Sequence, residues 1–119
     1  MKEERAVKDC VFCQIIAGDS PCQKIFEDDE VLVFHDNQPA APVHALIIPK
    51  RHIASMNEVG DEHAEAIVAI HRAARTAARE LGIAETGYRL VNNCGPDAGQ
   101  VIPHLHFHLL GGKKLGMTH

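Results

Sequence analysis

The sequence contains no tryptophan, and aromatic residues make up only 4% of its 119 residues. Surfaces on which nucleobases stack are therefore scarce. Basic charge is also scarce, because 12 Lys and Arg residues face 16 Asp and Glu residues and give a formal net charge of −4. Binding to a long nucleic acid needs a large basic face, and the densest basic spots here are Lys50-Arg51 and Lys113-Lys114. We therefore expect no long nucleic acid as a partner, although a single nucleotide needs only a pocket.

Long apolar runs are missing as well. No stretch approaches the roughly 20 apolar residues of a membrane span. Residues 1–9 mix charges and lack the apolar segment of a signal peptide, so we expect a loose tail there. We expect a cytoplasmic protein without membrane contact, whose four cysteines stay reduced and are candidates for metal binding or burial before disulfides. The length fits a single domain over residues 1–119.

Turn residues and hydrophobic periodicity predict the elements of an α+β domain. A short helix is expected over 11–17, and a long amphipathic helix is expected to begin at an Asp61 cap and end near Leu81. Strands are expected over 23–27, 31–35, 44–49, 88–92 and 104–110. The continuous apolar run over 44–49 indicates a strand buried on both faces. Several meandering strands with one long helix favour an antiparallel sheet.

Three of the nine histidines alternate with apolar residues near the C-terminus, in the order His104-Leu-His106-Phe-His108. On a strand these side chains share one face at a spacing of roughly 7 Å. Three charged imidazoles would repel one another, so at least some should be neutral at pH 7. Neutral imidazoles serve as nucleophiles, general bases or metal ligands. The pattern therefore fits nucleophilic catalysis, a catalytic zinc held mainly by this strand, or a strand whose histidines merely face water.

The loop ahead of these histidines, Asn-Cys-Gly-Pro-Asp-Ala-Gly-Gln over 93–100, is rich in turn formers. Gly95 and Gly99 allow close approach of the backbone, and consecutive amides can form a nest that binds an anion. Asn93 and Gln100 can add side-chain donors. An ordinary tight turn has the same composition, but the position before three histidines favours a phosphate-binding loop.

The pair Cys10-Val-Phe-Cys13 is a weaker signal, because its spacing fits a redox pair or two buried thiols equally well. Cys22 and Cys94 have no partner in the sequence, and we interpret both as unligated thiols. The histidines for which we expect a surface or helix-flank position without a catalytic role are His35, His63, His71 and His119.

Taken together, these motifs resemble the histidine-triad family of nucleotide-binding hydrolases and transferases. The likeness runs from Cys10-Val-Phe-Cys13 through Ile-Pro-Lys-Arg-His52 to Leu-Leu-Gly-Gly112, and it is nearest to the branch of small phosphoramidases that act on nucleoside 5′-phosphoramidates. The resemblance implies a five-stranded antiparallel sheet with one short and one long helix. It also implies a homodimer that pairs through the long helix and the neighbouring strand.

The resemblance further implies a role for four histidines. His106 would attack the α-phosphorus of a purine nucleotide and form a nucleotidyl-histidine intermediate that water then hydrolyses. His104 and His108 would hold phosphate oxygens and the correct tautomer, with His108 near the leaving group. His44 would orient the nucleophile or relay a proton.

Other positions are implied to bind the nucleotide or a metal. Asp36 would accept hydrogen bonds from the ribose hydroxyls, and the base would be lined by Phe12, Ile15 and Phe34. Some members of the family bind zinc with two cysteines and two histidines. The matching residues form a closed set suited to structural zinc: Cys10, Cys13, His52 and His104.

Three departures from the family pattern concern the substrate side. Val101 stands where phosphoramidases often carry a hydroxyl residue, Asn37 replaces an apolar position of the base pocket, and residues 115–119 lack a tail containing Trp-Pro. Two alternatives therefore stand beside the phosphoramidase. One is a dinucleoside polyphosphate hydrolase with the same nucleophile, and the other is a nucleotide-binding adaptor with little catalysis.

Overall fold

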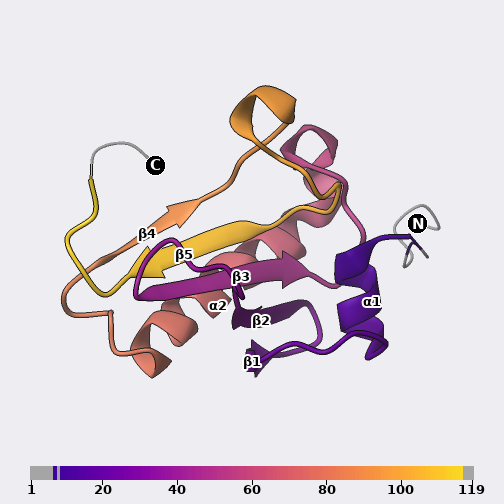
Figure 1. The fold of residues 1–119 in the computed structure, drawn as a ribbon. Coiled ribbons are helices and arrows are strands. Elements are labelled where there is room, and N and C mark those ends of the chain that lie inside the picture. Colours follow the sequence, from indigo (N-terminus) through magenta and orange to yellow (C-terminus); the bar gives the residue numbers. More distant parts are fainter. Residues whose placement is uncertain (1–6, 8, 117–119) are drawn as a thin grey trace.

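A computed structural model describes residue 7 and residues 9–116 of the chain (Figure 1). Five strands form one antiparallel sheet in the order β1-β2-β3-β5-β4. The strands are β1 (Lys24–Glu27), β2 (Val31–His35), β3 (Val43–Pro49), β4 (Tyr88–Val91) and β5 (Phe107–Gly111). The helices are α1 (Val11–Ala17) and α2 (Ala64–Glu80), with single 3₁₀ turns η2 (Met56–Glu58), η3 (Asp61–His63) and η4 (Pro96–Ala98).

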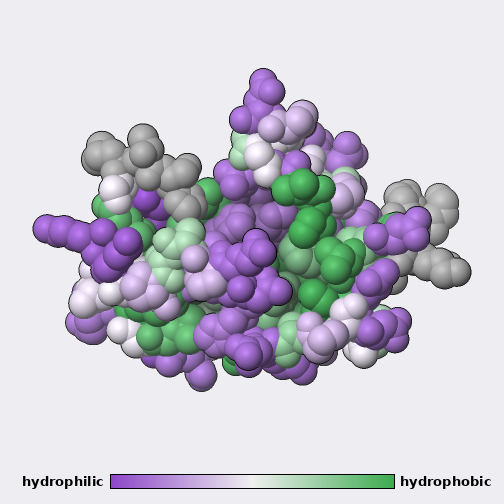
Figure 2. Space-filling model, viewed as in Figure 1, coloured by the Kyte–Doolittle hydropathy of each residue, from purple (hydrophilic) through white to green (hydrophobic). Residues whose placement is uncertain are grey.

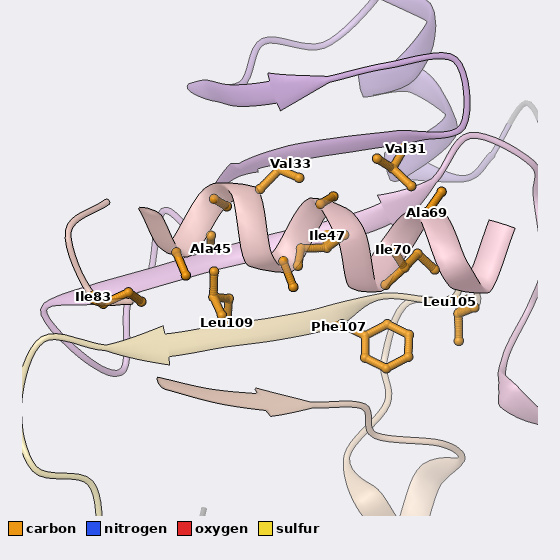
Figure 3. Close-up of a cluster of buried hydrophobic side chains, with 14 of the residues drawn as sticks. Val31, Val33, Ala45, Ile47, Ala69, Ile70, Ile83, Leu105, Phe107 and Leu109 are labelled. Atoms are coloured by element: carbon orange, nitrogen blue, oxygen red, sulfur yellow. The ribbon is translucent and has the colours of Figure 1, made fainter. Parts of the chain in front are cut away.

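One face of the sheet packs against α2. Alternate residues of the central strands point toward this helix, among them Val33, Ala45 and Leu109 (Figure 3). The helix meets them with a face made largely of alanine, and Ile70 is fully buried there. Small side chains let the helix lie close to the sheet, and the apolar stripe supplies the packing that stabilises it. No helix in the described part of the chain is long and apolar enough to cross a membrane.

The opposite face of the sheet is also covered. Leu32, Leu46 and Ile48 alternate with the residues that face α2, and they join Phe12 of α1 in a second apolar cluster. Strand β3 is therefore buried on both faces, as its continuous apolar run predicts. This second face carries the histidines.

The start of the long helix differs from the expectation. Asp61 is not its cap: Gly60 holds the cap position of η3, which spans residues 61–63, His63 holds the cap position of α2, and α2 begins at Ala64. His63, expected at the surface or at a helix flank, does flank α2 but is only 2% exposed. Its Nδ1 accepts a hydrogen bond from the Gly60 amide at 2.8 Å, so the imidazole closes the helix entry that a carboxylate was expected to cap.

The strand of the three histidines is shorter than expected. Strand β5 begins at Phe107, so His104 and His106 precede it. Pro103 has no amide hydrogen, and the Leu105 amide donates to the Ile53 carbonyl at 2.6 Å instead of to a strand. β2 has the expected bounds, and the other strand ends that change do so by one residue: β1 starts at 24, β3 starts at 43, β4 ends at 91 and β5 ends at 111. Leu105, Phe107 and Leu109 nevertheless pack together under α2, so the predicted alternation holds.

Candidate active site

The site is built where β3, β5 and the segment before β5 meet, on the face opposite α2. Residue pairing places Leu46 across from His108 and His44 across from Leu110. His44 and His108 therefore lie diagonally on neighbouring strands, and their ring centroids are 5.1 Å apart. The ring of His106 lies 5.3 Å from that of His108. The imidazoles of His44, His106 and His108 thus form one group.

The tautomer of His106 is set by the backbone. Its Nδ1 lies 2.7 Å from the His104 carbonyl oxygen, which can only accept, so Nδ1 carries the hydrogen. In the neutral ring, Nε2 then holds a lone pair. The side chain is 9% exposed. His106 therefore presents an unprotonated nitrogen from a fixed ring, which is the form in which imidazole acts as a nucleophile.

A residue that sequence reasoning missed fixes the backbone here. Asn92 follows β4, and its Nδ2 donates to the His106 carbonyl at 2.9 Å. The pairing of Val91 with His108 brings it into reach. An asparagine at the last position of an expected strand is the only signal in the sequence, and turn formers are common at such places.

A hydrogen-bonded chain fixes the second pair of imidazoles. The Ala40 amide donates to His44 Nδ1 at 2.9 Å, so the hydrogen of His44 is on Nε2. That nitrogen lies 2.9 Å from His108 Nδ1, which accepts it, and 3.4 Å from Asp36 Oδ2. The neutral His108 ring therefore carries its own hydrogen on Nε2. Asp36, expected at the ribose, lies against His44, and its Oδ1 accepts from the Gln38 amide at 2.8 Å.

The four expected metal ligands come together in a second cluster. Their ligand atoms, from Cys10, Cys13, His52 and His104, all lie within 4.8 Å of one another. His104 Nδ1 is 3.3 Å from Cys10 Sγ and 3.6 Å from Cys13 Sγ, and His52 Nδ1 is 3.3 Å from Cys13 Sγ. In tetrahedral zinc a nitrogen and a sulfur ligand are about 3.6 Å apart. The spacing thus fits the expected ion.

Hydrogen bonding and burial prepare the same cluster for a metal. His104 Nε2 donates to the Pro49 carbonyl at 2.9 Å, which leaves Nδ1 unprotonated toward the sulfurs, the arrangement usual for a metal-bound histidine. Burial lowers the pKa of His104 to about 4, and it also lowers the pKa of His52. Burial raises the pKa of the Cys13 thiol, so this thiol must lose its proton when a metal binds. Both imidazoles are therefore neutral near pH 7, as metal ligation requires.

The triad histidines do not share one metal-binding group. Of the three triad histidines, all within the described residues, His104 belongs to the cysteine–histidine cluster, His108 belongs to the group with Asp36 and His44, and His106 belongs to neither. A zinc ion held mainly by this strand is therefore not supported. The hydrogen on His44 Nε2, set by the Ala40 amide, also disfavours a metal in the second group.

The loop over 93–100 is braced from inside. Gln100 Oε1 accepts from the Gly95 amide at 2.9 Å, and its Nε2 donates to the carbonyls of Ala54 and Ile102, both at 3.0 Å. The amides of Gly99 and Gln100 bond to carbonyls within the loop. Both expected nest glycines have a φ of +87°, but the donors of Gly95, Gly99 and Gln100 are already used. Asn93, also expected to donate to the phosphate, is half-buried. Its side chain takes no part in the hydrogen bonds described for this loop.

The residues expected at the base form an apolar area beside the histidines. Phe12 and Phe34 are buried, and Ile15 and Ile102 pack partly exposed against them. Figure 2 shows hydrophobic side chains gathered next to α1, beside a hydrophilic area over the centre of this face. Cys22 packs against the same cluster, and Cys94 is half-buried. No described cysteine forms a disulfide.

The other histidines lie away from this face or outside the described residues. His35 is exposed, and exposed His71 has its Nδ1 2.8 Å from the Ile67 carbonyl on α2. Buried His63 is discussed above. His119 lies outside the described residues.

Comparison with known proteins supports the resemblance. The model of the HIT domain family matches residues 17–115. A relative from Escherichia coli K12, named purine nucleoside phosphoramidase, is 41% identical over 109 residues, which are 92% of this chain and 92% of the relative. An uncharacterised HIT-like protein from Azospirillum brasilense is 45% identical over 107 residues, 89% of this chain and 88% of the relative.

Solved structures agree with the sequence matches. A HIT family hydrolase from Clostridium thermocellum has a TM-score of 0.91 and 50% identity, covering 94% of this chain and 97% of that one. A HIT family hydrolase from Legionella pneumophila has a TM-score of 0.89 and 44% identity, covering 92% of this chain and 97% of that one. The chain therefore belongs to the histidine-triad (HIT) family.

Proposed function

We propose that this protein is a hydrolase of purine nucleoside 5′-phosphoramidates that works through a nucleotidyl-histidine intermediate on His106. The observation that carries the proposal is the 2.7 Å hydrogen bond from His106 Nδ1 to the His104 carbonyl. It leaves Nε2 as a nucleophile at the centre of the histidine group. The relative from Escherichia coli K12, 41% identical and named for this activity, supports the substrate class.

The proposed reaction has two displacements at phosphorus. His106 Nε2 attacks the α-phosphorus, a bond forms between them, and the phosphorus–nitrogen bond to the amine breaks. The departing amine takes up a proton from Nε2 of His108. Water then attacks the phosphorus and returns a proton to that nitrogen, the bond between phosphorus and Nε2 of His106 breaks, and the nucleoside monophosphate leaves.

The remaining histidines hold the reacting groups in this scheme. His108 offers its Nε2 hydrogen to a phosphate oxygen or to the leaving group, because His44 occupies its Nδ1 at 2.9 Å. In this scheme Asp36 binds the ribose, Asn93 binds the phosphate, and Ile15 and Phe34 contact the base. Asp36 also lies close enough to His44 to stabilise positive charge on the imidazole pair.

We also propose a structural zinc ion on Cys10, Cys13, His52 and His104. Four protein ligands close the coordination shell, so the ion supplies structural stability and no open position for water. The reaction above does not use it. The ligand spacing and the tautomer of His104 support this assignment.

Kinetics with matched variants test the proposed function. His106→Ala should lose measurable turnover of adenosine 5′-phosphoramidate while nucleotide binding largely remains. His71→Ala, at an exposed histidine of α2, is the control and should keep turnover. Near-native turnover by His106→Ala would refute the nucleophile assignment.

A substrate comparison separates the alternatives. We expect a higher kcat/KM for adenosine 5′-phosphoramidate than for diadenosine tetraphosphate, because a chain of net charge −4 offers little stabilisation to a polyphosphate leaving group. A ratio below one would place the protein with the dinucleoside polyphosphate hydrolases. Tight nucleotide binding without turnover of either substrate would favour the adaptor.

We further propose a homodimer of single-domain chains in the cytoplasm. The outer face of α2 has a hollow lined by Ile67, Val68, His71, Arg72 and Arg75. Val68 is 55% exposed there, so the hollow presents apolar surface to a partner. Edge strand β4 lies at the end of the sheet and supplies the neighbouring strand of the expected interface.

A further inference from the structure

Phe12 connects the cysteine–histidine cluster to the proposed nucleophile. It lies in the first turn of α1, between Cys10 and Cys13, and its side chain is only 4% exposed. Its ring centroid is 5.7 Å from that of His104 and 5.2 Å from that of His106, with interplanar angles of 82° and 79°. These are edge-to-face contacts at attractive distances. One aromatic ring thus touches both a metal-ligand candidate and the nucleophile.

The ring of His106 is held at two places by residues of this region. The His104 carbonyl accepts its Nδ1 hydrogen at 2.7 Å, and Phe12 packs against the ring. His104 is itself fixed, because its Nε2 donates to Pro49 and its Nδ1 faces the sulfurs. Rotation of the His106 ring would break the hydrogen bond and the aromatic contact together.

The position of Phe12 depends on what holds α1. A helix of seven residues is too short to be stable alone. Its N-terminus is held by Cys10, whose Sγ accepts from the Cys13 amide at 3.4 Å and lies 3.3 Å from His104 Nδ1. Phe12 also packs edge-on against Phe34, with ring centroids 5.9 Å apart. The two sulfurs therefore help to determine where the Phe12 ring lies.

We propose that Phe12 is a positioning residue for His106, and that the cysteine–histidine cluster thereby controls the orientation of the nucleophile. With a metal bound, the four ligands hold α1 and His104 as one unit, and Phe12 and the His104 carbonyl transmit this order to His106. The inference rests on the proposed function in taking His106 as the nucleophile, and on the proposed zinc ion at the cysteine–histidine cluster. It gives Phe12 a role beyond lining the base.

Phe12→Leu removes the ring and keeps apolar volume, so it tests the positioning directly. In the zinc-loaded full chain without substrate, we expect the imidazole NMR signal of the His106 Nδ1 hydrogen to broaden or disappear. We expect kcat to fall about tenfold, as for other small misplacements of a reacting group. Zinc per chain should stay unchanged. Ile16→Ala, on the same helix and against the same apolar cluster, is the control and should keep the signal.

A separate experiment tests the coupling between the cysteine–histidine cluster and His106. Cys13→Ser, with zinc content measured, should change the His106 signal as Phe12→Leu does. The coupling is overturned if this signal is the same in zinc-loaded wild type and zinc-free Cys13→Ser, or if the wild type binds no zinc on titration. Phe12 is no positioning residue if Phe12→Leu keeps both the signal and kcat. Phe12→Met provides the same readout should Phe12→Leu not fold.

Failure of the proposed function gives a different result. The NMR signal needs no substrate, so it reports on Phe12 whatever the reaction is. Full turnover by His106→Ala would refute the assignment of His106 as the nucleophile. An unchanged His106 signal in Phe12→Leu would refute only the positioning role of Phe12.

Discussion

At the scale of single residues, the site depends on which nitrogen of each histidine carries the hydrogen. Backbone groups decide the tautomer of three histidines. The His104 carbonyl sets that of His106, the Pro49 carbonyl sets that of His104, and the Ala40 amide sets that of His44. These backbone partners are far from their histidines in sequence or lie in irregular segments. Sequence patterns therefore identify the imidazoles but not their protonation.

The buried His104 predicts a pH dependence of stability. Burial lowers its pKa in the folded protein to about 4, against about 6.5 in the unfolded chain. Between these pH values the unfolded chain binds a proton that the folded chain excludes. The free energy of unfolding should therefore fall as pH falls from 6.5 toward 4, by on the order of 3 kcal/mol from this group.

Thermal unfolding with a chelator present measures this effect without metal. His104→Gln should flatten the decline in Tm between pH 6.5 and 4, although it lowers Tm overall. His35→Gln, at an exposed position, should keep the wild-type slope. Parallel curves for the wild type and His104→Gln would show that His104 does not carry the dependence.

At the scale of elements, the loop over 93–100 shows what a side chain can do for a backbone segment. Gln100 connects Gly95 to Ala54 and Ile102 through three hydrogen bonds. It thereby joins the loop to the segment that carries His52. Gln100→Ala removes all three bonds, and the loss should cost roughly 1–3 kcal/mol of stability.

The functional consequence of Gln100→Ala should fall mainly on substrate binding. A loosened loop orders the phosphate side less well, so KM should rise severalfold while zinc content stays near that of the wild type. Gln38→Ala, at an exposed glutamine, is the control. Unchanged KM and Tm in Gln100→Ala would contradict the bracing role.

Most elements can be predicted from the sequence, because their signals are local. The alternation around Leu105, Phe107 and Leu109 and the apolar run of β3 give the correct faces. The start of β5 and the helix entry cannot be predicted in this way. Leu105 bonds to Ile53, and His63 replaces an Asp61 cap, so both depend on contacts that tertiary structure creates.

The same difference holds for the candidate site. The histidines and cysteines are recognisable by type and spacing, and the structure brings them into two adjacent clusters. Asn92 and the internal bonding of Gln100 are not recognisable, because asparagine and glutamine in turns have many ordinary roles. Position along the chain reveals candidate ligands, whereas hydrogen-bond partners require the fold.

At the scale of the whole molecule, zinc should stabilise the fold by holding α1 against the segment before β5. Removal of the metal by a chelator should lower Tm by about 5 °C or more, because binding to the folded state alone shifts the unfolding equilibrium. Metal analysis should find about one zinc per chain. Cys22→Ser, outside the cluster, should keep the metal, and a zinc-free protein with unchanged Tm would contradict the structural role.

Assembly is the second property at this scale. Light scattering at micromolar concentration should give the mass of a dimer, because the hollow and exposed Val68 on α2 leave apolar surface to cover. Val68→Glu should produce monomers by placing a charge in this hollow, where we propose the interface. Val101→Glu is the control, because Val101 is 87% exposed on the loop before the histidines. A monomer mass for the wild type would refute the dimer.

The central claim is that His106 carries the nucleotide during turnover, and trapping that intermediate tests it most directly. Enzyme mixed with adenosine 5′-phosphoramidate is denatured within the first turnover at alkaline pH, where a phosphorus–imidazole bond survives, and its peptides are examined by mass spectrometry. The account predicts an adenylyl group on His106 in the wild type and in His71→Ala, and none in His106→Ala. An adduct on His44, His104 or His108, or turnover by the wild type with no adduct on any histidine, would contradict it.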